Sequence, residues 1–204
     1  MYVLTCDGHA LIIDPVPHIS GTETENCIPD GIILTHEHYD HICGVDEWRV
    51  KYSCPVYAGS NAEAGLADPR LNMSHYGKAM FEMMFPGDAS VLALGDIADY
   101  SCKPDHVWND GEIFRWRGNE LYIMHTPGHS QGSICIVLNG RYLFCGDSLL
   151  EYLPTGVRWK GGDAKRFRDY TIPLLRSLDS DLTVYPGHGE GFILKDYKFW
   201  EQTT

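Results

Sequence analysis

The sequence predicts an α/β layered fold, and three features of the chain support this prediction. Strand-like runs and a helical pattern alternate in the first sixty residues, which is typical of layered α/β proteins. After residue 112, strand-like runs follow one another, with an Asn-Gly turn dipeptide between two of them. With 204 residues, of which 44% are apolar, the chain can form one core without a disulfide or a structural metal. We therefore predict a single domain over residues 1–204.

The first half of the chain supplies strands, a loop and a helix in turn. Two strand-like runs, 2–4 and 10–13, flank the turn dipeptide Asp7-Gly8 and predict a hairpin. Residues 15–30 contain three prolines and little apolar periodicity, which indicates a loop. Beyond this loop the pattern predicts a buried strand, a helix and a second strand, at 31–34, 42–52 and 55–58.

Residues 62–92 differ in character from the rest of the chain. Met and Phe residues cluster between two prolines in this segment, and we predict a helical insertion there. We expect Tyr76, Met80, Phe81 and Met84 of this insertion to face a substrate. The second half of the chain then predicts four antiparallel strands, a helix and a last strand, at 112–116, 120–126, 133–138, 142–145, 165–178 and 182–185.

Charge and composition exclude several classes of partner. The formal net charge of −12 repels phosphate backbones and anionic membrane surfaces, so we expect no nucleic-acid or membrane partner. No apolar run approaches the length that crosses a bilayer, and no basic stretch leads into an apolar one at the start. The seven cysteines form no Cys-x-x-Cys pair. We expect reduced thiols, a cytoplasmic location and a small-molecule substrate.

The segment from His36 to His41 carries the strongest chemical signal. It reads His36-x-His38-x-Asp40-His41 and places three imidazoles and a carboxylate within six residues, directly after a predicted strand. Such a turn lets its side chains converge on one point. A single histidine is more often a structural residue than a ligand, but chance clustering of all four residues is improbable.

Three further candidates each lie just beyond a predicted strand. They are His129 in Thr-Pro-Gly-His-Ser, Asp147 in Cys-Gly-Asp-Ser, and His188 in Tyr-Pro-Gly-His-Gly. The neighbouring glycines allow the tight turns that a ligand loop requires. Five histidines and two aspartates form a nitrogen and oxygen ligand set that suits Zn, Mn or Fe and does not resemble a thiolate site.

These motifs resemble the metallo-β-lactamase-fold superfamily, and within it the glyoxalase II (hydroxyacylglutathione hydrolase)-like branch. The similarity spans nearly the whole chain and includes Leu-Ile-Ile-Asp14-Pro15, the 35–41 segment, the three glycine-flanked motifs and the Gly-Gly-Asp163 helix start. The resemblance implies a four-layer αββα sandwich. It also implies that Asp14 supports the site from behind the metal ligands, although a helix or turn cap is at least as good an interpretation.

The resemblance further implies two divalent metal ions, with Zn²⁺ as the first choice and Fe or Mn as alternatives. In this resemblance the ligands of the first ion would be His36, His38 and His129, and those of the second ion would be Asp40, His41 and His188. Asp147 would bridge the two ions. Two such ions generate a bridging hydroxide near neutral pH and polarise a carbonyl group. Asp40 would also accept a proton from the nucleophile and is the catalytic candidate.

The sequence therefore predicts a dinuclear metal-dependent hydrolase that acts on a small ester, thioester or lactone. A mononuclear-iron persulfide dioxygenase of the same fold is the alternative enzyme, and a metal-binding protein without turnover is the alternative outside catalysis. Basic segments at 158–160 and 165–166 follow Asp147 and either meet an anionic substrate group or form a solvated surface.

Overall fold

The computed structural model describes residues 1–17, 26–84, 87 and 97–202, and it describes the backbone alone at Met80, Met83 and Met84. Within these residues the chain forms two β-sheets. The first sheet has the strand order β1-β2-β3-β4-β5, in which β1 and β2 are antiparallel and the following pairs are parallel. Its strands are Tyr2–Cys6, His9–Ile13, Ile28–Ile33, Val56–Gly59 and His106–Trp108.

The second sheet has the order β11-β10-β9-β8-β7-β6. Strands β6 to β9 form an antiparallel meander, β10 lies parallel to β9, and β11 pairs antiparallel with β10. From β6 to β11 the strands are Ile113–Trp116, Asn119–His125, Ile134–Leu138, Tyr142–Gly146, Thr183–Pro186 and Phe192–Ile193. The antiparallel strands predicted between 112 and 145 therefore correspond to this meander.

The helices lie in three groups along the chain. Helices α1 and α2 follow β3, α3 and α4 lie between β4 and β5, and α6 and α7 follow β9, with a π-helical stretch between them. In chain order these helical elements are Tyr39–Ile42, Val45–Tyr52, Glu63–Ala67, Gly77–Met84, Ala164–Arg166, Phe167–Thr171 and Ile172–Arg176. Further 3₁₀ turns lie at Ser60–Ala62, Ser74–Tyr76 and Leu194–Asp196.

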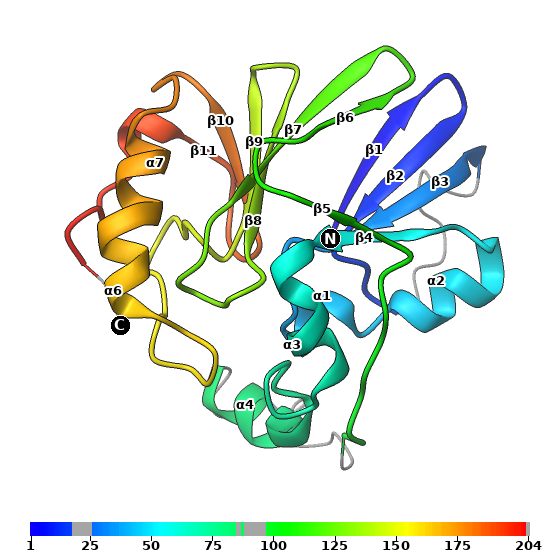
Figure 1. The fold of residues 1–204 in the computed structure, drawn as a ribbon, viewed down its shortest axis with the longest axis horizontal. Coiled ribbons are helices and arrows are strands. Elements are labelled where there is room, and N and C mark those ends of the chain that lie inside the picture. Colours follow the sequence, from blue (N-terminus) through cyan, green and yellow to red (C-terminus); the bar gives the residue numbers. More distant parts are fainter. Residues whose placement is uncertain (18–25, 85–86, 88–96, 203–204) are drawn as a thin grey trace.

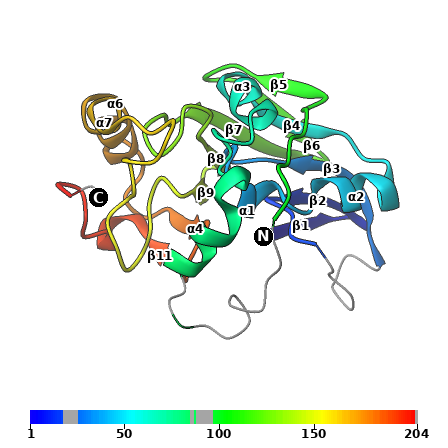
Figure 2. The same ribbon diagram turned by 90° about the horizontal axis from the view of Figure 1, so that it is seen from below.

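The sheets and helices stack in four layers. Helix α2 covers one side of the paired sheets and helices α6 and α7 cover the opposite side, as Figures 1 and 2 show in two perpendicular views. The two sheets pack face to face between these helical layers, around a cluster that includes Leu11, Ile33, Ile123 and Phe144. This arrangement confirms the predicted four-layer αββα sandwich.

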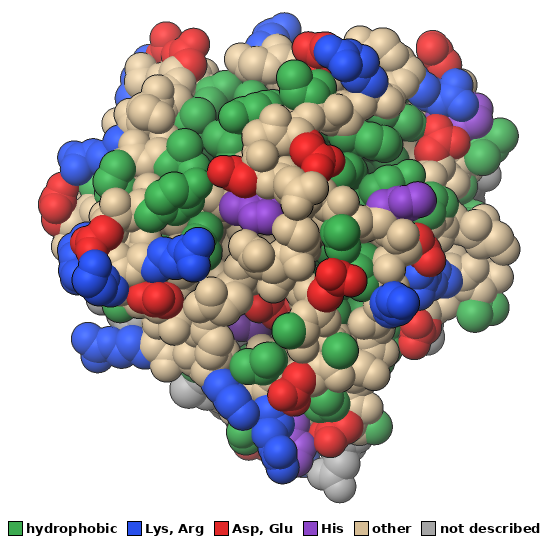
Figure 3. Space-filling view, viewed as in Figure 1, with side chains coloured by type: hydrophobic (Ala, Val, Ile, Leu, Met, Phe, Trp, Pro, Cys, Tyr) green, Lys and Arg blue, Asp and Glu red, His purple; other side chains and the backbone are tan. Residues whose placement is uncertain are grey.

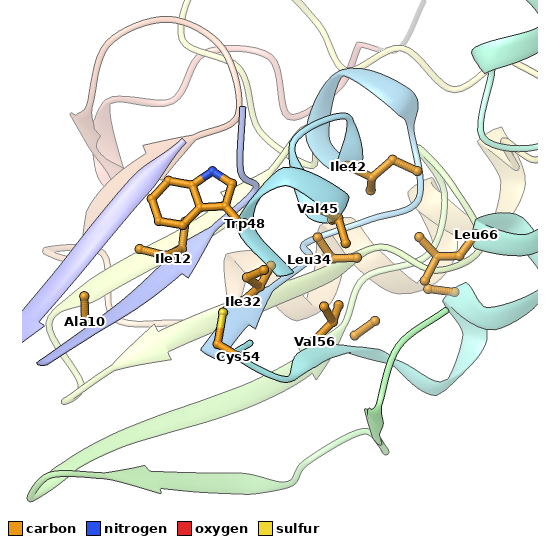
Figure 4. Packing of buried hydrophobic residues seen from close by; sticks show 12 residues of the cluster. Ala10, Ile12, Ile32, Leu34, Ile42, Val45, Trp48, Cys54, Val56 and Leu66 are labelled. Carbon is orange, nitrogen blue, oxygen red and sulfur yellow. The ribbon is translucent and has the colours of Figure 1, made fainter. Parts of the chain in front are cut away.

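Alternation along the strands explains why each sheet buries both of its faces. In β2, Leu11 and Ile13 pack between the sheets, whereas Ala10 and Ile12 belong to the cluster under α2. Figure 4 shows Trp48 of α2 close to Ile12, within the cluster that this helix forms with the first sheet. The second sheet also buries both of its faces, since residues such as Met124 and Cys145 pack in a cluster with Leu175 of α7.

The structure differs from the sequence prediction at the helix expected over 42–52. The chain instead forms α1 and α2, which are separated at Cys43 and Gly44. The cause is close contact with another segment, because the amide of Gly44 donates a hydrogen bond of 3.1 Å to the carbonyl oxygen of Pro15. A Cβ atom at residue 44 would lie 2.6 Å from that oxygen, so the approach requires glycine. Strands β5 and β11, of three and two residues, were not predicted.

Surface charges are mixed on the face that Figure 3 shows, where basic and acidic side chains alternate around the periphery. Among the described residues, no helix has the length and apolar character that a membrane-spanning helix needs. The helices α3 and α4 lie in the segment predicted to be a helical insertion, and residues 85–86 and 88–92 of that segment lie outside the described part.

Candidate metal centre

Loops that follow four strands bring the seven candidate ligands together. The segment from His36 to His41 follows β3, His129 follows β7, Asp147 follows β9 and His188 follows β10. A glycine precedes His188 because the backbone there passes very close to the site. A Cβ atom at Gly187 would overlap an oxygen of Asp147 and would lie 2.6 Å from the His41 ring.

The first group consists of His36, His38 and His129. Each offers a ring nitrogen within 4.8 Å of the other two, and Nδ1 of His38 lies 2.9 Å from Nε2 of His129. Burial lowers the pKa of His38 to about 3 and that of His129 to about 4, and it lowers the pKa of His36 well below its ordinary value. The three imidazoles are therefore neutral at pH 7, which is the protonation state that binds metal.

The second group consists of Asp40, His41 and His188 and has the opposite electrostatic character. Nε2 of His188 lies 3.0 Å from a carboxylate oxygen of Asp40 and 3.3 Å from Nε2 of His41. Burial opposes a charge on His41, but Asp40, Asp147 and Asp14 outweigh it and raise its pKa to about 10. The hydrogen bond to Asp40 likewise raises the pKa of His188. These carboxylates favour a positive charge at this point, either protons or a cation in their place.

Asp147 lies between the two groups. Its oxygen Oδ1 is 3.5 Å from Nε2 of His41, and Oδ2 is 3.5 Å from Nε2 of His188 and 3.6 Å from Nε2 of His129. The carboxylate therefore reaches one histidine of the first group and both histidines of the second. This is the position that a ligand shared by two cations requires.

Three contacts behind the ligands fix the ring orientations. Asp14 accepts hydrogen bonds from Nδ1 of His41 at 2.8 Å and from the backbone amide and hydroxyl of Thr35 at 2.7 and 2.6 Å. The Thr35 hydroxyl also lies 3.1 Å from Nδ1 of His36, and Nδ1 of His129 donates to the carbonyl oxygen of Gly156 at 2.7 Å. Each of these bonds directs Nε2 of the same ring toward the site. Asp14 therefore acts on the site through His41.

The donor atoms fit divalent cations. Within the described part of the chain, the buried Nε2 atoms of His36 and His38 and the buried Oδ1 of Asp147 have no hydrogen-bond partner. Buried polar atoms normally have partners, so these three require an additional group. Neutral imidazole nitrogens and carboxylate oxygens are the ligand types that Zn, Mn and Fe accept. The geometry thus suits two cations, with Asp147 between them.

Glu37 also belongs to the site, although it was not among the residues predicted from the sequence. Its side chain is only 3% exposed, and it accepts hydrogen bonds from the Ser130 hydroxyl at 2.6 Å and from the amide of Gly132 at 3.3 Å. Burial raises the pKa of this carboxyl group. Glu37 therefore ties the loop of His36 and His38 to the loop of His129. No pattern in the sequence distinguishes this glutamate from a solvent-exposed one.

Replacing Glu37 with Ala is expected to destabilise the metal-free protein by about 1 to 3 kcal/mol, because it leaves buried donors of the 130–132 loop without an acceptor. Glu37→Gln retains an acceptor for Gly132 and a partner for Ser130. This variant is the matched control and should lose less stability than Glu37→Ala. Urea unfolding of the two variants measures the difference. Equal stability of Glu37→Ala and the wild type would show that the link between the loops does not stabilise the protein.

A cavity of about 410 Å³ opens above the two groups. Its floor contains His38, Asp40, His129, Asp147 and His188, and the remaining lining residues are mainly apolar, namely Met73, Leu150, Glu151, Tyr152, Leu153, Gly156, Trp159 and Gly189. Most of the wall therefore comes from residues 150–159. Of the four residues expected to face a substrate, Tyr76 and Phe81 do not line the cavity, and the side chains of Met80 and Met84 lie outside the described part.

This fold and this cluster of histidines and aspartates define a layered α/β protein with a candidate metal centre, and comparison with known proteins gives the family. Residues 1–188 match the family model of the metallo-beta-lactamase superfamily, and the chain belongs to that superfamily. The chain is also 27% identical over 192 residues to the hydroxyacylglutathione hydrolase of Francisella tularensis subsp. novicida (strain U112), with 92% of this chain and 61% of that protein covered. The chain thus spans about three fifths of the length of this curated relative.

Two solved structures share the fold and similar levels of identity. The BLEG-1 B3 metallo-beta-lactamase superposes with a TM-score of 0.69 at 26% identity, covering 95% of this chain and 88% of the other. TTHA1623 in a di-iron-bound form gives a TM-score of 0.67 at 26% identity, covering 96% and 89%. The suspected resemblance to this superfamily and to its glyoxalase II-like members is therefore confirmed.

Proposed function

We propose that the protein is a dinuclear metal-dependent hydrolase that acts on a small ester, thioester or lactone. The observation that carries the proposal is the meeting of seven nitrogen and oxygen ligands from four loops, five of which form the floor of a cavity of about 410 Å³. His36, His38 and His129 would hold one divalent ion, Asp40, His41 and His188 the other, and Asp147 would contact both. Zn²⁺ is the first choice of metal, and Fe is supported by the di-iron form of a structural relative.

Two such ions, when bound, lower the pKa of water toward neutrality and polarise a carbonyl oxygen. The chain's own residues supply the rest of the chemistry. Asp40 lines the cavity and its side chain is 13% exposed, so its carboxylate can meet a substrate or a water molecule there. Its neighbours His41 and His188 hold its pKa below the ordinary value, although burial opposes this. We propose that Asp40 accepts the proton that the nucleophile releases.

The apolar wall supports hydrolysis of a small organic substrate. Leu150, Leu153 and Trp159 give one side of the cavity an apolar surface, which suits the organic part of a substrate whose carbonyl group lies at the floor. The free state of all seven cysteines supports a cytoplasmic location. The net charge of −12 supports the expectation that nucleic acids and anionic membranes are not partners.

We predict that the purified protein holds two metal ions per chain and that chelation abolishes hydrolysis, because each group has three ligands besides Asp147. Elemental analysis of the protein as purified, followed by assays of thioesters, lactones and esters with metal restored, tests this. His75→Ala is the control, since this histidine is 41% exposed and pairs with Asp99 instead of the site. One iron per chain with thiol-dependent oxygen uptake would favour the persulfide dioxygenase, and two metals without any turnover would favour a binding protein.

A further inference from the structure

The wall of the cavity differs in charge from the floor, where the candidate metal ligands lie. Among the described residues that line the cavity, none is Lys or Arg, and the single charged residue of the wall is Glu151. Substrate contact and a solvated surface were the alternatives for the basic segments 158–160 and 165–166, and their basic side chains do not line the cavity, although Trp159 does. Arg158 and Lys160 are exposed and do not line the cavity, and Lys165 pairs with Asp169 at 2.6 Å. An anionic group on a substrate therefore finds no cationic side chain in this wall.

Glu151 contributes a carboxylate to the wall and forms a side-chain hydrogen bond with Tyr152. Its Oε2 atom is buried and accepts no hydrogen bond within the described part of the chain. The Glu151 side chain nevertheless lines the cavity, so its negative charge repels a substrate carboxylate that lies against the wall. An uncharged acyl chain meets no such barrier.

The wall is also held in register with the metal ligands. The Thr155 hydroxyl donates to the carbonyl oxygen of Ser148 at 2.9 Å, and the carbonyl oxygen of Gly156 accepts from Nδ1 of His129. Val157 is buried in a cluster with Phe167. Between these anchors, Tyr152 and Leu153 are 68% and 53% exposed and line the cavity, so they offer apolar surface to a bound substrate.

We propose that residues 150–159 recognise an uncharged, apolar acyl group and that Glu151 makes the cavity select against acyl groups that carry a carboxylate. This inference rests on the proposed hydrolase function and names its substrate class. The acyl chain lies along Leu150, Leu153 and Trp159, with its carbonyl carbon at the floor. The hydrophobic contacts determine chain-length preference, and Glu151 determines charge preference.

A matched pair of substrates tests the charge preference. The N-acetylcysteamine thioesters of hexanoate and of adipate have the same chain length and differ by one terminal carboxylate. We expect the metal-loaded wild type to favour the hexanoyl substrate by at least about tenfold in kcat/KM, which corresponds to about 1.4 kcal/mol. Glu151→Gln should reduce this ratio severalfold, and Leu153→Ala should instead reduce the preference for hexanoyl over acetyl by about tenfold. Ile113→Ala, an exposed residue of β6, is the control and should change neither ratio.

Binding of the amide analogues, in which nitrogen replaces the ester sulfur, separates this inference from the proposed function. If calorimetry shows that the hexanoyl amide binds more tightly than the adipoyl amide and that Glu151→Gln narrows the gap, the inference stands even when no thioester is hydrolysed. If thioesters are hydrolysed but adipoyl equals or exceeds hexanoyl, the inference is wrong and the hydrolase function remains. An unchanged ratio in Glu151→Gln would likewise overturn the role of this residue.

Discussion

Asp147→Asn is expected to weaken metal binding at both groups at once and to abolish turnover. The carboxylate reaches His129 of the first group and both His41 and His188 of the second, at 3.5 to 3.6 Å. An amide keeps the size of the side chain but removes the negative charge that offsets two neighbouring dications. Since the loss of a residue that only orients a ligand costs about 10- to 100-fold in metal affinity, loss of a shared ligand should cost at least as much at each group.

Competition with a chelator, followed by elemental analysis, measures the affinity of each ion. Asp181→Asn is the control, because Asp181 is an exposed carboxylate that pairs with Lys195 far from the site. We expect its metal content to equal that of the wild type. If Asp147→Asn lost one ion and kept the other with unchanged affinity, Asp147 would be a ligand of one group and not a shared one.

Much of the fold was predictable because the buried strands carry their own signal. Residues 10–13 and 31–34 are apolar throughout, since both faces of the first sheet are covered, and the meander from β6 to β9 follows the predicted runs and the Asn-Gly turn. Strands β5 and β11 have only three and two residues, too few for a period to appear. The break between α1 and α2 depends on the Pro15 backbone, which is distant in sequence.

The candidate site, like the fold, was predictable from the sequence only in part. Clustered histidines and glycine-flanked turns identified the seven candidate ligands because metal chemistry restricts residue types. Glu37 was not predicted from the sequence, because Ser130 and Gly132 contact it only in the folded chain. The cavity wall at 150–159 was not predicted either, because this segment lacks helical or strand periodicity. The substrate contacts were instead predicted in the Met-rich segment 62–92. Of that segment, Met73 does line the cavity.

The unequal charge of the two groups leads to the last prediction, which concerns Asp40. The first group is three buried neutral imidazoles, whereas the second depends on a carboxylate 3.0 Å from His188 and 3.5 Å from His41. Asp40→Ala should therefore remove the ion of the second group and leave the first group occupied. It should also lower turnover by at least about 10²-fold, the usual effect of losing a positioned proton acceptor.

Metal content and kcat of the same preparation check both parts of this expectation, and Asp99→Ala is the control because Asp99 is exposed and pairs with His75. A comparison with Asp147→Asn then distinguishes a shared ligand from a ligand of one group. Asp147→Asn affects both ions, whereas Asp40→Ala affects one. Loss of both ions in Asp40→Ala would mean that the first group cannot hold metal alone, and full activity with two ions would exclude Asp40 as ligand and as proton acceptor.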